Sequence, residues 1–406
     1  GDILRQDNEP FTNINRIMKK TAILIGALAC CLSSEALAHD HIRKIRIPDI
    51  EGYKTLVCEF HTHTIYSDGS VMPSVRVGEA LNEGIHVIAV TEHIEDYCRK
   101  IPETNPVDLN TSYNLYKEAA EGTGLIVIRG GEISRGMPPG HLNALFLKDV
   151  NPLNTEYTDQ GAWDAVEEAA SQGAFIIWNH PGWKPQQPDS TCWFDFHTRM
   201  HEKGWLHGIE ICNYLDGCYP ETLTWYGEKN LAPIAGSDTH GPTFYEFDLV
   251  NSHRPVTLVF AREQTEEGVR EALFDRRSVA YDNNFLYGAE RWLQAIFRAS
   301  VRCKESGRAD GCYRYVFENT SDIEFQLVLK QGRKVPESIT LQPHACTEVL
   351  SESPIGKAGY ECLNMFHARD AHPNVPAVGR LAASGHEETA SFLLVGTSLG
   401  RSPVPL

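Results

Sequence analysis

The sequence is poor in positive charge. Its 406 residues include 37 Lys and Arg against 54 Asp and Glu, a formal net charge of −17. Such a surface repels phosphate backbones, so we expect no nucleic-acid partner. The sequence also lacks a Cys-x-x-Cys pair, so a structural zinc knuckle is not indicated. The remaining composition, 42% hydrophobic and 22% charged, predicts a globular chain with room for one large and one smaller domain.

The N-terminal apolar run, residues 22–32, is too short to span a bilayer. It follows the basic start Met18-Lys19-Lys20 and precedes an Ala-x-Ala site at residues 36–38. This pattern predicts a signal peptide over residues 18–38 and a periplasmic or secreted bacterial protein without a stable membrane anchor. A retained anchor or a buried helix is the alternative. Residues 1–17 are interpreted as a non-native upstream segment.

Cysteine is present in an odd number beyond the signal peptide. Two of the 11 cysteines, Cys30 and Cys31, lie within it, which leaves nine. Cys303 and Cys312 flank a short polar turn. They are expected either to form a disulfide across a hairpin or to remain two buried thiols.

Between residues 54 and 260, short apolar runs alternate with amphipathic stretches, the latter at residues 75–83, 112–121 and 163–172. Such alternation indicates parallel strands joined by crossover helices, and seven or eight units favour an α/β barrel over an open sheet. Polar residues gather directly after the strands, where such a barrel carries its active site. The expected strands are residues 55–60, 86–90, 125–129, 143–147, 174–178, 208–212, 232–235 and 256–260.

After Glu290 the pattern changes. Short alternating strands are expected at residues 314–318, 324–330 and 346–350, with no long helix. This predicts a small β-rich, sandwich-like domain over residues 291–390, following a catalytic domain over residues 45–290. The Gly-, Ser- and Pro-containing end, residues 391–406, is expected to be a disordered tail.

His61 and His63 lie two residues apart after the first expected strand. Alternate residues of an extended chain face the same side, so both imidazoles point one way and form a metal clamp. Asp68 follows in a Ser-Asp-Gly turn, within reach of a neighbouring ion. Taken alone, the pattern fits a surface His-x-His pair beside a turn equally well.

Further polar clusters lie beside the other expected strands. A single histidine after a strand is more often structural, but repetition at strand ends indicates one shared site at one rim. The clusters are Thr91-Glu92-His93, Gly130-Gly131-Glu132, His141, Asn179-His180-Pro181-Gly182-Trp183 and Gly236-Ser237-Asp238-Thr239-His240.

These motifs resemble the PHP (polymerase and histidinol phosphatase) family. The resemblance covers residues 45–290 and is carried by HTHTIYSDGS, TEHIE, GGEIS, GHLNALF, NHPGWKPQQPD and GSDTH, in the family's order. The stretch NHPGWKPQQPDS, HGIEICN and EKNLAPIAGSDTH is more similar still to the Sb-PDE-type bacterial phosphodiesterases, which act on alkyl and haloalkyl phosphate diesters. The resemblance implies a distorted (β/α)7 barrel with a trinuclear metal centre.

The resemblance also implies the ligand set. All its positions hold nitrogen or oxygen donors and none holds a cysteine, which suits Zn²⁺, Mn²⁺ or Fe²⁺. Glu132 bridges two ions, and Glu132, Asp238 and His240 are the expected catalytic residues. The first metal would be held by His61, His63, Glu132 and Asp238, the second by Glu132, His141 and His180, and the third by Asp68, His93 and His240.

Phosphate esters are anionic and repel nucleophiles. Clustered dications neutralise that charge and lower the pKa of bound water from 15.7 toward about 7. We expect a metal-bridging hydroxide to attack phosphorus in line with the leaving oxygen. The favoured activity is hydrolysis of small organophosphate diesters, and the expected partner is a small-molecule phosphate ester.

Nearby residues are candidates for substrate binding. Arg135 and Lys184 follow Glu132 and His180 closely, and each is expected to contact a phosphoryl oxygen or to be an ordinary solvated charge. Trp183 and Trp193 are candidates to wall an apolar pocket for an ester arm. Trp178 lies inside a strand, where core packing is expected.

Three other functions fit parts of the pattern. A phosphomonoesterase of the histidinol-phosphatase type has the same fold, but a signal peptide argues against a cytoplasmic biosynthetic step. A non-catalytic metal-binding surface protein would use the β-rich domain, but the ligand set is complete. Amidohydrolases also place His-x-His in a barrel, but the Gly-Gly-Glu and Asn-His-Pro clusters fit them less well.

Overall fold

The computed structural model describes residues 42–95 and 108–376. These divide into two compact units, residues 42–296 with Leu363–Pro373, and Phe297–Cys362 with residues 374–376. The predicted upstream segment 1–17, signal peptide 18–38 and tail 391–406 lie outside the described residues. No helix within 42–95 or 108–376 has the length and apolar character needed to cross a membrane.

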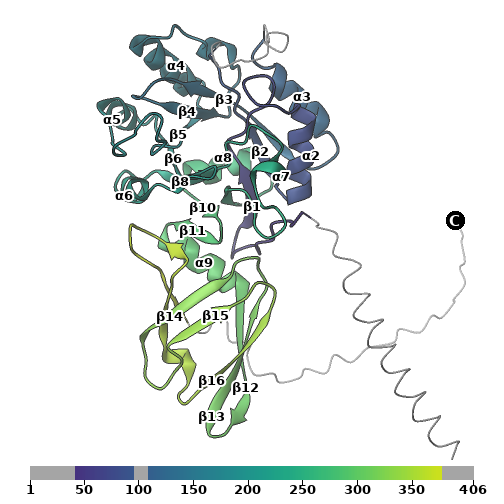
Figure 1. The fold of residues 1–406 in the computed structure, drawn as a ribbon, viewed down its shortest axis with the longest axis vertical. Coiled ribbons are helices and arrows are strands. Elements are labelled where there is room, and N and C mark those ends of the chain that lie inside the picture. Colours follow the sequence, from purple (N-terminus) through teal and green to yellow (C-terminus); the bar gives the residue numbers. More distant parts are fainter. Residues whose placement is uncertain (1–41, 96–107, 377–406) are drawn as a thin grey trace, which may run out of the picture. The chain divides into compact units, whose positions relative to one another are not determined.

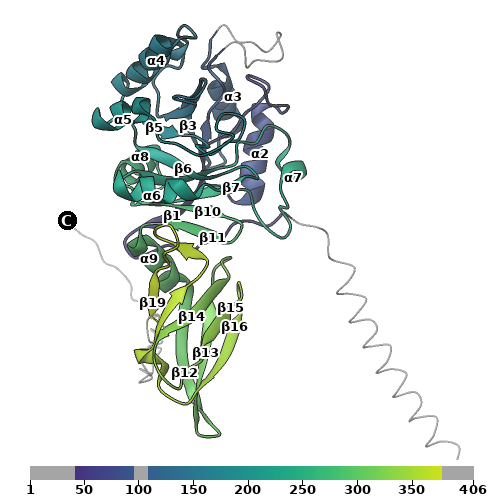
Figure 2. The same ribbon diagram turned by 60° about the vertical axis from the view of Figure 1, so that its left-hand side comes forward.

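The first unit is built on one curled, 12-stranded sheet (Figures 1 and 2). Every apolar run predicted as a strand between residues 54 and 260 forms one, with ends shifted by a few residues. The strands are β1 (Lys54–Glu59), β2 (Val87–Val90), β3 (Ile126–Ser134), β4 (His141–Leu145), β5 (Phe175–Trp178), β6 (Gly208–Asn213), β7 (Gly217–Cys218), β8 (Ala232–Gly236), β9 (Val256–Ala261), β10 (Ser278–Asp282), β11 (Phe285–Gly288) and β18 (Met365–Phe366).

The strand directions differ from the all-parallel set that the sequence predicts. β1, β2 and β3 run parallel, as do β5, β6 and β8. β4 is antiparallel to both its neighbours because only a short turn, residues 135–140, joins it to β3. β9 pairs antiparallel with β1. Beyond the strand ends, an isolated bridge joins Thr62 to Thr239 and brings the loops after β1 and β8 together.

Two apolar clusters hold the sheet in place. One contains alternate residues of β1, β2 and β9 together with Val269, Ala272 and Leu273 of the helix after β9. The other packs Trp178 and Ile209 against the helices that follow β4 and β5. The sheet is therefore fixed from both faces, and the loops at its carboxyl ends project from a rigid base.

The helices connect successive strands, and α2 and α3 lie side by side (Figure 1). Thr158 and Thr265 cap two of them, each accepting a backbone N–H at 3.0 Å through its hydroxyl. The helices are α2 (Pro73–Glu83), α3 (Thr111–Ala119), α4 (Asp159–Ser171), α5 (Asp195–Glu202), α6 (Pro220–Glu228), α7 (Thr243–Glu246), α8 (Glu266–Phe274) and α9 (Glu290–Ser300), with the single turn η3 (Asn151–Leu153).

The second unit contains two antiparallel sheets, with strand orders β12-β13-β16 and β15-β14-β17-β19. The sequence predicts β13, β14 and β16 but not β12, β15 or the strands after Ser351, nor α9, which begins at Glu290. The strands are β12 (Val301–Ala309), β13 (Cys312–Asn319), β14 (Phe325–Gln331), β15 (Ser338–Leu341), β16 (Cys346–Ser351), β17 (Gly359–Cys362) and β19 (Asn374–Pro376), with the turn η4 (Ile355–Lys357).

Cys303 and Cys312 are both free thiols, but only Cys303 is buried and Cys312 is partly exposed, so neither expected outcome holds in full. The register of the β12–β13 hairpin explains why the two are not joined. Cys303 pairs with Phe317, whereas Cys312 pairs with Ala309 next to the turn, so the two cysteines do not face each other.

Candidate metal centre

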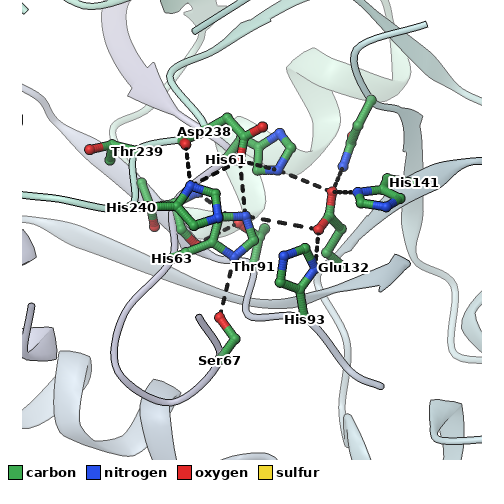
Figure 3. A network of polar contacts seen from close by, with 12 residues as sticks. His61, His63, Ser67, Thr91, His93, Glu132, His141, Asp238, Thr239 and His240 are labelled. Carbon is green, nitrogen blue, oxygen red and sulfur yellow. Dashed lines mark hydrogen bonds and ion pairs between the residues drawn. The ribbon is translucent and has the colours of Figure 1, made fainter. Parts of the chain in front are cut away.

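All nine predicted ligands lie at the carboxyl-end loops or neighbouring strand ends of the curled sheet, and their side chains converge (Figure 3). Antiparallel β4 contributes at its start because it runs against its neighbours. The ligands are His61, His63 and Asp68 after β1, His93 after β2, Glu132 in β3, His141 at the start of β4, His180 after β5, and Asp238 and His240 after β8.

His61 and His63 point the same way, as their spacing predicts, and both reach Asp238. Oδ1 of Asp238 lies 3.2 Å from Nε2 of His61 and 3.1 Å from Nε2 of His63. Nε2 of His61 is also 3.2 Å from Oε1 of Glu132. These four residues form one compact donor set.

Glu132 lies at the centre of the cluster, and its side chain is fully buried. Oε1 lies 3.2 Å from Nδ1 of His141 and 3.7 Å from Nε2 of His180. Oε2 lies 2.6 Å from Nδ1 of His93. With the contact to His61 included, its carboxylate therefore contacts donors from four other loops or strand ends, the position expected of a bridging ligand.

Asp68, His93 and His240 form the third donor set. Oδ1 of Asp68 lies 2.9 Å from Nε2 of His240 and 3.4 Å from Nε2 of His93. The ring of His63 stacks between theirs, with centroids 4.4 Å from His93 and 4.3 Å from His240. Oxygen and nitrogen donors again face one another across a small space.

The donor atoms fit divalent ions. In the described part of the chain, the buried atoms Nε2 of His61, Nε2 of His63 and Nδ1 of His141 have no hydrogen-bond partner, although carboxylate oxygens lie near them. Ligand atoms bound at about 2.0–2.1 Å around one ion lie roughly 3.0–3.4 Å apart. The contacts of 3.1 and 3.2 Å among His61, His63, Asp238 and Glu132 match that spacing.

The electrostatics of His63 and Asp238 favour metal binding. Burial and the neighbouring rings of His240 and His93 together lower the pKa of His63 to about 3, so its ring is neutral. Burial raises the pKa of Asp238, but the imidazoles of His61 and His63 outweigh it and hold that pKa well below its usual range. Neutral imidazoles and ionised carboxylates are the forms that bind divalent metals.

Two ligands have a strained backbone. His180 has φ 28° and Asp238 has φ 50°, both in the left-handed region that residues with a Cβ rarely adopt. Close packing maintains the loops nearby. A Cβ on Gly69 would lie 2.8 Å from the carbonyl carbon of His63, so this position of the Ser-Asp-Gly turn requires glycine. Such strain is typical of sites where surrounding contacts dictate a functional geometry.

Glu210 of β6 is a buried carboxylate that the sequence analysis missed. Its Oε1 lies 2.8 Å from Nδ1 of His61, and its Oε2 accepts the backbone N–H of His180 at 2.6 Å. It therefore directs Nε2 of His61 toward the metal cluster. The sequence of this strand is GIEICN. A single acidic residue in an otherwise apolar strand is the sequence feature that could have indicated this role.

Glu92 organises the loop that carries Asp68. It accepts hydrogen bonds from Thr64 N at 2.9 Å, Ser67 Oγ at 2.6 Å and Ser112 Oγ at 2.7 Å. These bonds fix the chain between His63 and Asp68.

An arginine side chain also holds the backbone of the loops that carry the predicted ligands. Arg76 is fully buried and donates from Nε to the carbonyl of His63 and from Nη2 to that of Thr239, both at 3.0 Å. The guanidinium therefore ties the loop after β1 to the loop after β8. Both loops carry ligands, so Arg76 sets their separation.

A cavity of about 650 Å³ opens onto the cluster. Trp183, a predicted substrate-binding residue, lines it, and its ring lies 5.3 Å from that of His180. Apart from Trp183 and the predicted ligands, the wall consists of residues that were not predicted from the sequence. They are Gln186, Asn213, Tyr214, Asp216 and Glu246.

Arg135 and Lys184 are not among the described residues that line this cavity. Arg135 is nearly fully buried, with Nε 2.8 Å from Oε1 of Glu95 and Nη1 2.7 Å from the carbonyl of Glu156. Its guanidinium is thus engaged within the protein and borders a separate hollow beside Tyr157. Lys184 is exposed to solvent.

Trp178 and Trp193 pack away from the cavity. Trp178 is fully buried and stacks on His197 with ring centroids 3.7 Å apart, which agrees with its predicted place in the core. Trp193 meets Trp178 edge-on at 5.6 Å and is likewise not a wall of the metal cavity.

One solved structure decides the family. It is a two-domain protein from Bacteroides vulgatus that contains a predicted PHP-like metal-dependent phosphoesterase, and it is 39% identical to this chain. The alignment covers 82% of this chain and 97% of that one, with a TM-score of 0.76. This chain belongs to the PHP-like metal-dependent phosphoesterases. The family predicted from the motifs is confirmed, and the clustered His, Asp and Glu residues of this PHP-like phosphoesterase suit divalent metal ions.

Two other solved structures are more distant from this PHP-like phosphoesterase. A proposed metal-dependent phosphoesterase from Bifidobacterium adolescentis is 16% identical, with a TM-score of 0.38 over 55% of this chain and 97% of that one. An amidohydrolase from Chromobacterium violaceum is 14% identical, with a TM-score of 0.34 over 46% of this chain and 88% of that one. Both TM-scores are too low to support a conclusion about this chain. No family model and no curated protein matches the chain.

Proposed function

We propose that this protein is an exported phosphodiesterase of the Sb-PDE type, which hydrolyses small organophosphate diesters with three divalent ions. The observation that carries the proposal is the convergence of nine nitrogen and oxygen donors, without cysteine, on one cavity. The ions would be held as follows: the first by His61, His63, Glu132 and Asp238, the second by Glu132, His141 and His180, and the third by Asp68, His93 and His240.

Bound ions would neutralise the phosphate and make a water molecule nucleophilic at neutral pH. The chain's own groups would orient the reactants. Asp238, whose side chain is 18% exposed, lines the cavity, where its ionised carboxylate would accept a hydrogen bond from the attacking water and orient it. His240, 36% exposed, is held by the carbonyl of Asp238 at 2.8 Å and faces the substrate space at the cavity mouth.

The cavity wall supports a diester over a monoester. A monoester carries a charge of about −1.5 to −2 at pH 7, because its second pKa is about 6. A diester carries only a single negative charge. Among the described residues, the wall contains no Lys or Arg, while Asp216 and Glu246 add carboxylates beyond the ligand set. A second phosphate charge would therefore find no cationic side chain there.

The aromatic wall supports a diester with an organic arm. Trp183 and Tyr214 both line the cavity next to the cluster. Their rings offer apolar faces to an alkyl or aryl ester group, while the phosphoryl oxygens face the metal ligands. This arrangement suits a small-molecule substrate.

The test compares hydrolysis of bis(p-nitrophenyl) phosphate and p-nitrophenyl phosphate by protein reconstituted with Mn²⁺ or Zn²⁺. We expect a higher kcat/KM for the diester. Higher turnover of the monoester would favour the phosphatase alternative, and no turnover of either by the metal-loaded protein would favour a binding role. Glu118→Gln, an exposed substitution on α3, is the matched control for Glu132→Gln, which should be inactive.

A further inference from the structure

Two cysteines face each other across the hairpin beside the metal cavity. Cys212 of β6 pairs with Cys218 of β7 in antiparallel register. The N–H of Tyr219 donates to the carbonyl of Ile211 at 2.8 Å, which makes the cysteine pair next to it a non-hydrogen-bonded one. Both cysteines are thiols in this structure.

The pair meets the geometric requirement for a disulfide. Non-hydrogen-bonded partners have Cα atoms about 4.5 Å apart, and disulfides span Cα distances of about 4.4–6.8 Å. As directly opposed partners in register, the two side chains point to the same face of the hairpin. Burial raises the pKa of the Cys212 thiol well above its usual range, and its interaction with the Cys218 thiol raises it further.

We propose that Cys212 and Cys218 form a reversible disulfide that fixes one wall of the metal cavity. The segment between them contributes Asn213, Tyr214 and Asp216 to that wall. Nδ2 of Asn213 donates at 2.9 Å to Oε2 of Glu210, the carboxylate that orients His61. The bond would therefore close a short ring around residues that border the candidate metal ligands.

Among the residues that the structure describes, no other cysteine pair matches this arrangement. In residues 42–95 and 108–376, the strand partners of the remaining paired cysteines are not cysteines, as Cys58 with Val87 and Cys362 with Leu327 show. Cys192 is exposed and lies outside the strands. Cys212 and Cys218 thus differ from the other cysteines of the described residues because they are paired directly with each other across two strands.

The chemistry is disulfide exchange with a disulfide oxidant, such as oxidised glutathione or a dithiol oxidase. Cys218, which is partly exposed, would attack the oxidant as a thiolate, form a mixed disulfide and release one thiol. Cys212, which is buried, would then attack Sγ of Cys218 and release the second thiol. Two protein thiols lose two protons and two electrons, and the oxidant's disulfide is reduced to two thiols.

The test maps thiols in the full chain and requires no enzyme assay, so it is independent of the proposed activity. Reduced protein is incubated with oxidised glutathione, alkylated, digested without reductant and examined by mass spectrometry. We expect the loss of two alkylatable thiols, a peptide cross-linked between Cys212 and Cys218, and reversal by dithiothreitol. Cys218→Ser should remove this cross-link, whereas Cys346→Ser, at an exposed thiol of the second unit, should keep it.

Three results would overturn the proposed disulfide. They are recovery of both cysteines as alkylated thiols, a stable glutathione adduct on Cys218, and a cross-link from either cysteine to another one.

Hydrogen exchange tests whether the disulfide affects the cavity wall. Backbone amides at residues 213–217 should exchange more slowly in the oxidised protein. Equal exchange in both forms would show that the bond does not fix the cavity wall.

Discussion

Oε1 of Glu210 lies 2.8 Å from Nδ1 of His61, and neither residue is exposed to solvent. The contact fixes which nitrogen of His61 faces the other donors, because Nδ1 is engaged and only Nε2 remains for a metal. The second oxygen of the same carboxylate holds the backbone of His180 at 2.6 Å. A single residue on β6 thus positions two candidate ligands from two different loops.

Replacing Glu210 with Gln should weaken metal binding without unfolding the protein. The amide keeps the shape of the side chain but can no longer accept hydrogen bonds at both ends. Loss of such an outer partner typically reduces metal affinity or activity by about 10–100-fold. Metal titration with a chelator and kcat/KM measure this. Glu228→Gln, at an exposed position on α6, should behave as wild type. Unchanged affinity in Glu210→Gln would show that His61 is oriented by other contacts.

The close approach of β8 to the cluster gives a second prediction. A Cβ on Gly236 would lie 2.2 Å from Oε1 of Glu210 and 2.8 Å from Cβ of His61. Gly236→Ala must therefore displace one of them, and a misplacement of about 1 Å can reduce catalysis roughly 100-fold. Gly227→Ala is the matched control, because its new Cβ would meet nothing within 4 Å. Equal activity of the two variants would contradict the proposed packing.

The loop that carries Asp68 gives a third prediction. Glu92 accepts bonds from the loop residues Thr64 and Ser67. Glu92→Gln should loosen that loop and lower the metal content by one ion, because Asp68 is placed only in the third donor set. Circular dichroism should show an intact fold, and elemental analysis should show the missing ion. Full metal content together with full activity would mean that the loop is held without Glu92.

The buried imidazole of His197 makes stability depend on pH. Burial lowers its pKa from 6.5 to about 4, while its hydrogen bond to the carbonyl of Pro139 acts in the opposite direction. Between these two values the unfolded chain binds a proton that the folded protein does not. The contribution to stability is therefore fully present above pH 6.5 and is lost as the pH falls toward 4.

At pH 5 this loss corresponds to about 2 kcal/mol, since one pKa unit is worth about 1.4 kcal/mol. His197→Gln can still donate to Pro139 but does not titrate. Urea unfolding of metal-free protein at pH 7 and pH 5 should show a smaller loss of stability for the variant than for wild type. Parallel losses would place the pH dependence elsewhere in the chain.

Local sequence pattern predicts the strands and brings the candidate ligands to one edge of the sheet, where the structure groups them. The period of the apolar runs locates all eight strands that were expected between residues 54 and 260, and each polar cluster follows from its place at a strand end. His61 and His63 share a face because alternate residues of an extended chain do so. These features depend on neighbours in the sequence, so the sequence alone shows them.

Features set by tertiary contacts escaped prediction. The reversed direction of β4 depends on a short turn, and the apolar alternation reads the same in either direction. Glu210 looks like an isolated charge in an apolar strand until His61 is brought beside it from 149 positions away in the chain. Arg135 was expected either to contact a phosphoryl oxygen or to be a solvated charge, but it lies directly after the end of β3, where Glu95 pairs with it instead.

The most direct test of the metal centre is the divalent metal content of purified wild-type protein and of Glu132→Gln, measured by elemental analysis together with diester hydrolysis. Glu132 contacts His61, His93 and His141, so its loss should remove the ligand that we propose two ions share. We expect about three ions per active wild-type chain, and we expect Glu132→Gln to be inactive and to contain less metal. An active wild-type protein with one ion or none, or a variant with wild-type rate and metal content, would contradict the proposed metal centre.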